Sequence, residues 1–123
     1  MPHVKIRPPR PLPELLEVLE PLAARDETGV QKVRAYFLEK GGGTILAEAL
    51  VAEGGLPRHF FLSIQEREKA LVLRCYEATD PEKTAAVKRI IVRLGMEVRG
   101  RIEGAELDPC NLEKECAELG SSA

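Results

Sequence analysis

The stretch from His59 to Glu103 decides the fold, and its sequence is HFFLSIQEREKALVLRCYEATDPEKTAAVKRIIVRLGMEVRGRIE. Two runs rich in aliphatic, β-branched and aromatic residues, His59–Ile64 and Ala70–Tyr76, are separated by a charged segment of five residues. Runs of this composition favour β-strands, and five residues is a common length for a hairpin loop. We therefore predict a β-hairpin over residues 59–76.

A helix and another strand are predicted in the second half of this stretch. Asp80 and Pro81 are typical of a helix start, as the N-cap and the first helical residue. Apolar residues then recur at the spacing of one helix face: Val87, Ile90, Ile91 and Leu94. We expect Gly95 to end the helix. From Met96 to Glu103 apolar and charged residues alternate, which predicts a half-buried strand.

Two helices are predicted closer to the N-terminus. Residues 14–22 carry leucines at helical spacing, and Pro21 kinks or ends that helix. Thr28 is expected to cap a second helix over residues 29–40, because Gln31 three residues later completes a capping box and three glycines follow the segment.

Residues 44–53 admit two structures. Glycines on both sides bracket a segment of strand length, whereas the Ala, Leu and Glu content suits a helix. As a helix, the segment would give the first half of the chain the order of a winged helix-turn-helix. We favour the strand, because the run at 59–64 is too apolar to present polar side chains to base edges as a recognition helix must.

The two ends of the chain differ in composition. Residues 1–13 contain five prolines and several basic residues, which predicts an extended arm, with a short edge strand at His3–Arg7 at most. Residues 104–107 are expected to form a loop and residues 108–120 a short terminal helix that starts with Asp-Pro. Residues 121–123 are expected to fray.

Together these elements predict an α+β domain with the order α-α-β-β-β-α-β-α. We expect a mostly antiparallel sheet of about four strands with helices packed on one face. The single domain would span residues 14–120, between the arm and the frayed tail. Part of this order is similar to that of double-stranded-RNA-binding domains and of small acidic secretion chaperones.

Composition excludes several classes of protein. A hydrophobic content of 44% with a net charge of −2 is typical of a globular chain that has no overall attraction to nucleic acid or membrane. No run approaches the about eighteen apolar residues of a membrane span, and no signal peptide is evident, so we expect a cytoplasmic protein. The chain contains one Asn and two Gln but eleven Arg and seventeen Glu, and this balance resembles the composition of thermophile proteins.

No catalytic constellation, cofactor motif or metal site is predicted. The three cysteines include no CxxC pair, and the two histidines are isolated. Cys110 is the one candidate for a reactive thiol, because it would lie in the first turn of the terminal helix, where backbone dipoles lower a thiol pKa. Three acidic residues nearby act in the opposite direction: Glu106, Asp108 and Glu113.

Two surfaces are candidates for binding. Alternation in the hairpin and in the last strand would place aromatic and arginine side chains on one sheet face: Phe61, Arg74, Tyr76, Arg99 and Arg101. The helix between them has a basic face: Lys88, Arg89 and Arg93. Residues 83–101 carry six cations and one acid, whereas residues 102–123 carry six acids and one cation, so the acidic segment can cover the basic one.

Three functions follow from these features. The first is a non-enzymatic interaction module of the chaperone or adaptor kind, acting as a homodimer through the sheet face or the terminal helix, since Tyr and Arg are enriched at protein interfaces. The second is a module that binds nucleic acid or an anionic ligand through the same arginines and aromatic residues. The third is a thiol enzyme using Cys110.

Overall fold

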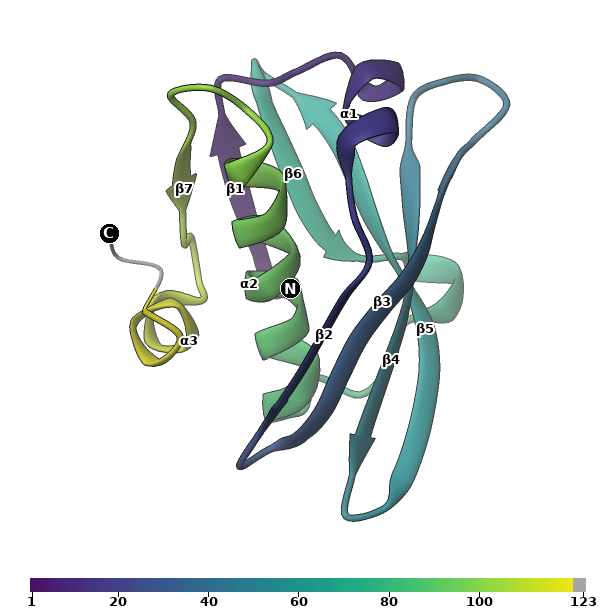
Figure 1. Ribbon diagram of the computed structural model, residues 1–123, viewed down its shortest axis with the longest axis vertical. Helices are drawn as coiled ribbons and strands as arrows, with labels where there is room; N and C mark the ends of the chain where they lie inside the picture. The colour runs from purple at the N-terminus through teal and green to yellow at the C-terminus, as the bar shows by residue number, and fades with distance from the viewer. Residues whose placement is uncertain (121–123) are drawn as a thin grey trace.

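The computed structural model describes residues 1–120, which form one antiparallel seven-stranded sheet curled around a single long helix (Figure 1). The strands are β1 (His3–Arg7), β2 (Leu22–Asp26), β3 (Gly29–Leu38), β4 (Ile45–Glu53), β5 (Leu56–Arg67), β6 (Ala70–Cys75) and β7 (Glu106–Asp108). The helices are α1 (Leu12–Val18), α2 (Ala85–Gly100) and α3 (Glu113–Glu118), and a 3-10 turn, η1, spans Glu77–Thr79.

The predicted fold class is wrong. The strand order across the sheet is β2-β3-β4-β5-β6-β1-β7, so the sheet has seven strands where about four were expected. The sheet is curled into a half-barrel that wraps around α2, and the helices do not form a layer on one face. The element order β-α-β-β-β-β-β-α-β-α also differs from the order that the two similar classes of domain suggested.

The helix predicted over residues 29–40 is in fact strand β3, which pairs with β2 on one side and β4 on the other. Gly29 adopts φ 126, and a Cβ at this position would lie 2.0 Å from the carbonyl oxygen of Ala52. Only glycine therefore allows β3 to begin this close to β4. Thr28 stabilises the β2–β3 turn and not a helix, because its N–H and hydroxyl both donate to Asp26 Oδ1, at 2.8 and 2.6 Å.

The remaining N-terminal elements also depart from expectation. The helix predicted over residues 14–22 is the shorter α1, and β2 begins at Leu22, directly after Pro21. The short strand expected at His3–Arg7 is present as β1, but it lies between β6 and β7, so it is an inner strand and not an edge strand. Its side chains Val4 and Ile6 are completely buried, which gives this proline-flanked segment enough apolar contact to hold it in the sheet.

The centre of the sheet is the part that patterning predicted well. Residues 45–53 form β4 as a strand, and the predicted hairpin is present as β5 and β6. Strand β5 is longer than expected, because the chain reverses at only two residues, Glu68 and Lys69, with φ 51 and 62, whereas β6 ends one residue earlier than predicted, at Cys75. The charged residues before this turn continue β5 to Arg67.

The predicted strand over residues 96–103 is wrong, because α2 continues through Gly95 to Gly100. A Cβ on Gly95 would lie 3.0 Å from side-chain atoms of both Val4 and Leu107, so the glycine allows β1 and β7 to pack against the helix. The helix also begins later than predicted. Its N-cap is Thr84, whose side chain accepts a hydrogen bond from the Val87 N–H at 3.3 Å.

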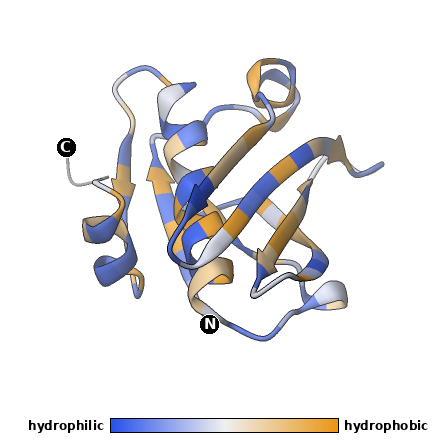
Figure 2. Ribbon diagram, turned by 60° about the horizontal axis from the view of Figure 1, so that its bottom comes forward, coloured by the Kyte–Doolittle hydropathy of each residue, from blue (hydrophilic) through white to orange (hydrophobic). Residues whose placement is uncertain are grey.

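Helix α2 is the centre of the hydrophobic core. Only its two terminal residues, Ala85 and Gly100, are exposed, and apolar side chains of every strand except β2 and β7 are buried in the same cluster. Figure 2 shows the resulting alternation of hydrophobic and hydrophilic residues along the long strands. Leu12 and Leu15 of α1 are buried in this cluster as well. Because the inner face of the sheet is filled in this way, binding surfaces must be sought on the outside.

The C-terminal segment packs against α2 from the side opposite β2 (Figure 1). The second half of the expected loop at residues 104–107 belongs to strand β7, and the predicted terminal helix is the shorter α3, which begins at Glu113 and not at Asp108-Pro109. The tail at 121–123, predicted to fray, lies outside the described residues. Among residues 1–120, no helix is long and apolar enough to cross a membrane.

Candidate functional site

Three of the five residues predicted to form a binding surface lie together on the outer face of the sheet, which is turned away from α2. Phe61 is on β5, Arg74 is on β6, and Tyr76 directly follows β6. Arg74 is paired with Ser63 in the ladder, and the Tyr76 N–H donates to the Phe61 carbonyl at 2.8 Å. The three side chains are therefore neighbours across two adjacent strands.

The other two residues, Arg99 and Arg101, lie at the C-terminal end of α2 and away from this face. Arg101 Nε donates to Glu97 Oε2 at 2.9 Å, and this hydrogen bond raises the pKa of Arg101. The Arg101 carbonyl also accepts from Arg10 Nη1 at 2.8 Å. The predicted surface is thus divided between the outer face of the sheet and the end of α2.

Apolar side chains form a strip along the middle of the outer face. We call this the outer strip, and its members are Phe37 on β3, Leu46 and Leu50 on β4, and Phe61 on β5. Phe37 is paired with Leu46 in the ladder and is 51% exposed, and the other three side chains are half-buried. Adjoining aliphatic and aromatic residues on a solvent-facing sheet are typical of an interaction surface.

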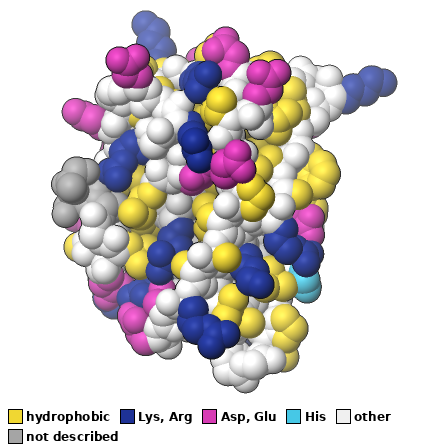
Figure 3. Space-filling model, viewed as in Figure 1, with side chains coloured by type: hydrophobic (Ala, Val, Ile, Leu, Met, Phe, Trp, Pro, Cys, Tyr) yellow, Lys and Arg dark blue, Asp and Glu magenta, His cyan; other side chains and the backbone are white. Residues whose placement is uncertain are grey.

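Cations border the outer strip on its β2–β3 side. Figure 3 shows Lys and Arg side chains gathered over these two strands, with hydrophobic side chains between them. The exposed cations of the two strands are Arg25, Lys32 and Arg34. Arg34 Nη2 forms an ion pair with Glu48 Oε2 on β4 at 2.5 Å. On the β5 side the strip ends at Phe61, and the exposed His59 lies next to it on the same strand face.

A basic depression lies farther along the same face, over β1, β5 and β6. We call it the Arg74 hollow; it has a volume of about 420 Å³ and is lined by Met1, His3, Lys5, Arg67, Glu68, Val72, Arg74 and Asn111. A second hollow of about 280 Å³ adjoins it and shares Arg67 and Arg74 with it. The second hollow is completed by Ser63, Gln65, Tyr76 and Glu77.

Sequence patterning identified Arg74 of this hollow and Tyr76 of the adjoining one but missed the other residues that line the Arg74 hollow. Lys5 and His3 belong to a segment that was expected to form an arm, yet β1 pairs with β6 so that Lys5 lies opposite Val72 and His3 opposite Arg74. The signal was present, because Val4 and Ile6 alternate with basic residues as in a half-buried strand.

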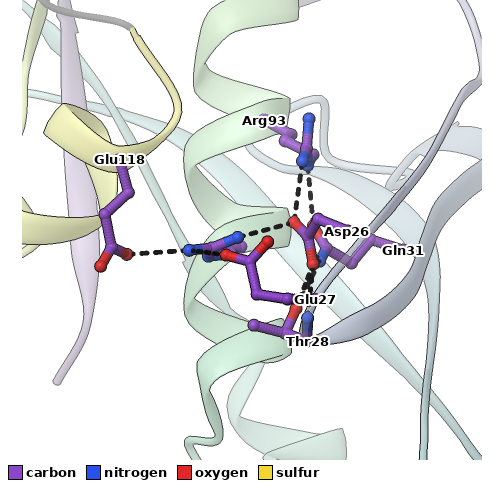
Figure 4. A network of polar contacts seen from close by, with 7 residues as sticks. Asp26, Glu27, Thr28, Gln31, Arg93 and Glu118 are labelled. Atoms are coloured by element: carbon purple, nitrogen blue, oxygen red, sulfur yellow. Dashed lines mark hydrogen bonds and ion pairs between the residues drawn. The ribbon is translucent and has the colours of Figure 1, made fainter.

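Two residues of the predicted basic helix face, Arg89 and Arg93, belong to a polar cluster beneath the β2–β3 turn, where Arg89 is buried and Arg93 is half-buried (Figure 4). We call this the Asp26 cluster: Asp26, Glu27, Thr28, Gln31, Arg89, Arg93 and Glu118. Lys88, the third residue of that face, is half-buried and lies outside the cluster.

The side chains of the Asp26 cluster are joined by hydrogen bonds and ion pairs. Asp26 Oδ2 accepts from Arg89 Nη1 and Arg93 Nη2, both at 2.9 Å. The fully buried Gln31 bridges Asp26 and Arg93, since its Nε2 donates to Asp26 and its Oε1 accepts from Arg93 Nε at 2.8 Å. Burial alone would raise the pKa of Asp26, but the hydrogen bonds from Thr28 and the two arginines outweigh it and hold that pKa well below its usual range.

The Asp26 cluster also reaches the C-terminal helix. Arg89 Nη2 contacts Glu27 Oε1 at 2.8 Å and Glu118 Oε1 at 3.1 Å, and only 8% of the Arg89 side chain is exposed. The hydrogen bond to Asp26, with those to the two glutamates, raises the pKa of Arg89 despite its burial. The cluster therefore joins the β2–β3 turn, α2 and α3, and it fixes structure more than it offers a free site.

The geometry around Cys110 does not favour a thiolate. Cys110 lies in the turn between β7 and α3 with φ 51, outside the first helical turn where it was predicted. Burial raises the pKa of its thiol, and the negative charge of Asp108 raises it further. Cys75 and Cys116 are buried. Within residues 1–120, no group of His, Cys, Asp and Glu side chains is arranged to hold a metal ion.

Comparison with protein-family models, with curated proteins and with solved structures finds no match to this chain. The outer strip and the Arg74 hollow are therefore the features from which a function has to be inferred. Both lie on the outer face of the sheet, and both involve residues that the sequence pattern had placed there.

Proposed function

We propose that the protein is a non-enzymatic interaction module that acts as a homodimer, with the outer strip as its interface. The observation that supports this is the strip of apolar side chains on the face of the sheet that is turned away from α2, with Phe37 51% exposed. Burying such side chains releases about 25 cal/mol for each Å² of apolar surface removed from water, so a partner surface is favoured there.

The arrangement of side chains across three strands favours a second copy of the same chain as the partner. Leu46 and Leu50 lie on the outward side of β4 with Glu48 between them, and the flanking strands carry Lys32 and Arg34 on β3 and His59 and Phe61 on β5. A two-fold axis along β4 would place β3 of one copy over β5 of the other. Lys32 and Arg34 would then face His59 and Phe61 of the second copy and not each other.

Such a contact has two favourable components. Leu46 and Leu50 of the two copies would meet at the axis, and the charge of Glu48 between them stays neutralised by its ion pair with Arg34 of the same copy. The guanidinium of Arg34 would approach the ring of Phe61 in the other copy, which is an attractive cation–π geometry. Because the sheet is curled around α2, its outer face is convex and the contact is limited to a narrow strip. We therefore expect a reversible dimer of modest affinity.

Sedimentation equilibrium over a wide range of protein concentration tests this proposal. The wild-type protein is expected to shift from monomer to dimer as concentration rises, and Leu50→Arg is expected to remain monomeric. Leu56→Arg is the matched control, because Leu56 is 60% exposed at the β4–β5 turn, outside the strip, and this variant should dimerise normally. Circular dichroism checks that both variants keep the wild-type fold.

A wild-type protein that stays monomeric at the highest soluble concentration would overturn the proposed homodimer. Equal loss of dimer in Leu50→Arg and Leu56→Arg would also overturn it, since it would show that any added charge, and not the outer strip, governs association.

A further inference from the structure

We propose that the Arg74 hollow binds a phosphoryl group carried by a small molecule. This site is separate from the outer strip, and its occupation does not require the proposed dimer. Its volume of about 420 Å³ is within the range of small-molecule sites, and six of its eight lining residues are polar or charged.

The charge of the lining favours an anion. Three permanent cations, Lys5, Arg67 and Arg74, line the hollow with a single acid, Glu68. Lys5 forms no ion pair within residues 1–120, and Arg67 Nη2 contacts only the neutral Gln65 Oε1, at 3.3 Å. The cations thus create a positive potential on a protein whose net charge is −2.

Arg74 is the residue whose surroundings point most directly to a missing partner. Only 26% of its side chain is exposed, yet its nearest carboxylate oxygen, on Glu77, lies 3.8 Å away. Its Nη1 donates to the sulfur of Met1 at 3.1 Å, and a thioether is a weak, uncharged acceptor. A guanidinium has five N–H donors in a planar fork, so most of the hydrogen-bonding capacity of Arg74 is free for an oxyanion.

Three cations around one hollow suit a phosphoryl group better than a carboxylate. A phosphate ester carries a charge of roughly −1.5 to −2 at neutral pH and three strong acceptor oxygens, whereas a carboxylate carries one charge. The register supports a shared ligand, because Lys5 lies opposite Val72 and is therefore diagonal to Arg74 on the next strand. Arg67, like Arg74, lines both this hollow and the adjoining one, so it can contact the same group.

The adjoining hollow indicates where the rest of the molecule would lie. It contains Tyr76, which is 37% exposed, together with the hydroxyl of Ser63 and the amide of Gln65. A flat ring attached to the phosphoryl group could stack on Tyr76 while Arg74 holds the phosphate oxygens. A phosphate ester with an aromatic ring, such as a mononucleotide, has this shape.

Isothermal titration calorimetry with pyrophosphate, in a phosphate-free buffer of constant ionic strength, tests the proposal. The wild-type protein is expected to bind pyrophosphate saturably, and Arg74→Gln is expected to weaken binding by roughly tenfold or more, as the loss of a charge-assisted contact predicts. Arg58→Gln is the matched control. Arg58 lies on β5, and 34% of its side chain is exposed. Its Nη1 is 3.9 Å from Glu82 Oε2, but Arg58 does not line the hollow.

Further titrations separate the possible carriers of the phosphoryl group. A 5′-mononucleotide that binds more tightly than pyrophosphate, with this advantage lost in Tyr76→Ala, supports the small-molecule site. Binding of a single-stranded oligonucleotide alone, without binding of either small ligand, overturns it in favour of a nucleic-acid surface. Equal binding of acetate and pyrophosphate, or equal weakening by Arg74→Gln and Arg58→Gln, also overturns it, because either result indicates non-specific charge.

Discussion

The Asp26 cluster and the Arg74 hollow both contain partly or fully buried arginines, but the two regions satisfy them differently. Arg89 in the cluster has carboxylate oxygens of three residues within 3.1 Å, and 8% of its side chain is exposed. Arg74 in the hollow is 26% exposed, and its one carboxylate neighbour is 3.8 Å away. A saturated arginine holds structure together, whereas an unsaturated one keeps donors for a ligand.

The position of each region agrees with this division. The Asp26 cluster lies between α2, the β2–β3 turn and α3, so its bonds connect elements that are distant in sequence. The Arg74 hollow lies on the convex side of the sheet, where removing a side chain leaves the core contacts unchanged. Comparing the effects of equivalent substitutions in the two regions therefore tests which of them is structural.

The largest effect is expected from Asp26→Ala. This variant removes the carboxylate that accepts from Arg89 and Arg93, and it leaves two arginines facing each other with one fewer anion. Breaking a buried ion pair in this way costs about 3–5 kcal/mol in the free energy of unfolding. Urea denaturation followed by circular dichroism measures it.

Glu48→Ala is the control for this measurement. Glu48 is 30% exposed and pairs with Arg34 alone on the outer face, so its loss should cost no more than about 1 kcal/mol. If the two variants lose the same stability, the Asp26 cluster is not the structural connection that its geometry indicates.

An intermediate effect is expected from pH. Because the pKa of Asp26 is lower in the folded state than its ordinary value of 3.8, its carboxylate stabilises the fold above the unfolded-state pKa. This contribution is lost as the pH falls through the folded-state pKa. The stability difference between wild type and Asp26→Ala should therefore be constant above about pH 5 and shrink as the pH is lowered further. A difference that does not change in acid would show that Asp26 contributes by packing and not by its charge.

The sequence predicted the centre of this molecule and misplaced much of its periphery, for identifiable reasons. The β5–β6 hairpin follows from long runs of strand-favouring residues, and a local pattern is sufficient there. Thr28 and Gln31 fit a capping box equally well, but they form hydrogen bonds to Asp26 in a hairpin turn, and this choice depends on Arg93, far away in the sequence. Tertiary contacts decided between two local structures that the pattern could not separate.

The candidate sites show the same limit. Gly95 has the residue type of a helix end, but it lies inside α2 because Val4 and Leu107 approach it, and this moved Arg99 and Arg101 away from the predicted surface. Lys5 could enter the Arg74 hollow only because β1 pairs with β6, a contact between segments almost seventy residues apart that periodicity does not report. Residues contributed by the hairpin itself were placed correctly, since their relation depends only on local register.

The smallest effect on stability, and the sharpest test of the comparison, is expected from Arg74→Gln without ligand. Arg74 has weak partners in the folded protein, so replacing it should change the free energy of unfolding by no more than about 0.5 kcal/mol, similar to Arg58→Gln. Urea denaturation under the conditions used for Asp26→Ala measures the change. A loss of 2 kcal/mol or more, about the size expected for a buried ion pair, would make Arg74 a structural residue like Arg89. A small change in the free energy of unfolding, together with weaker pyrophosphate binding, would show that Arg74 is a binding residue and not a structural one. The reason is that a binding residue contributes its interaction energy only when the ligand is present.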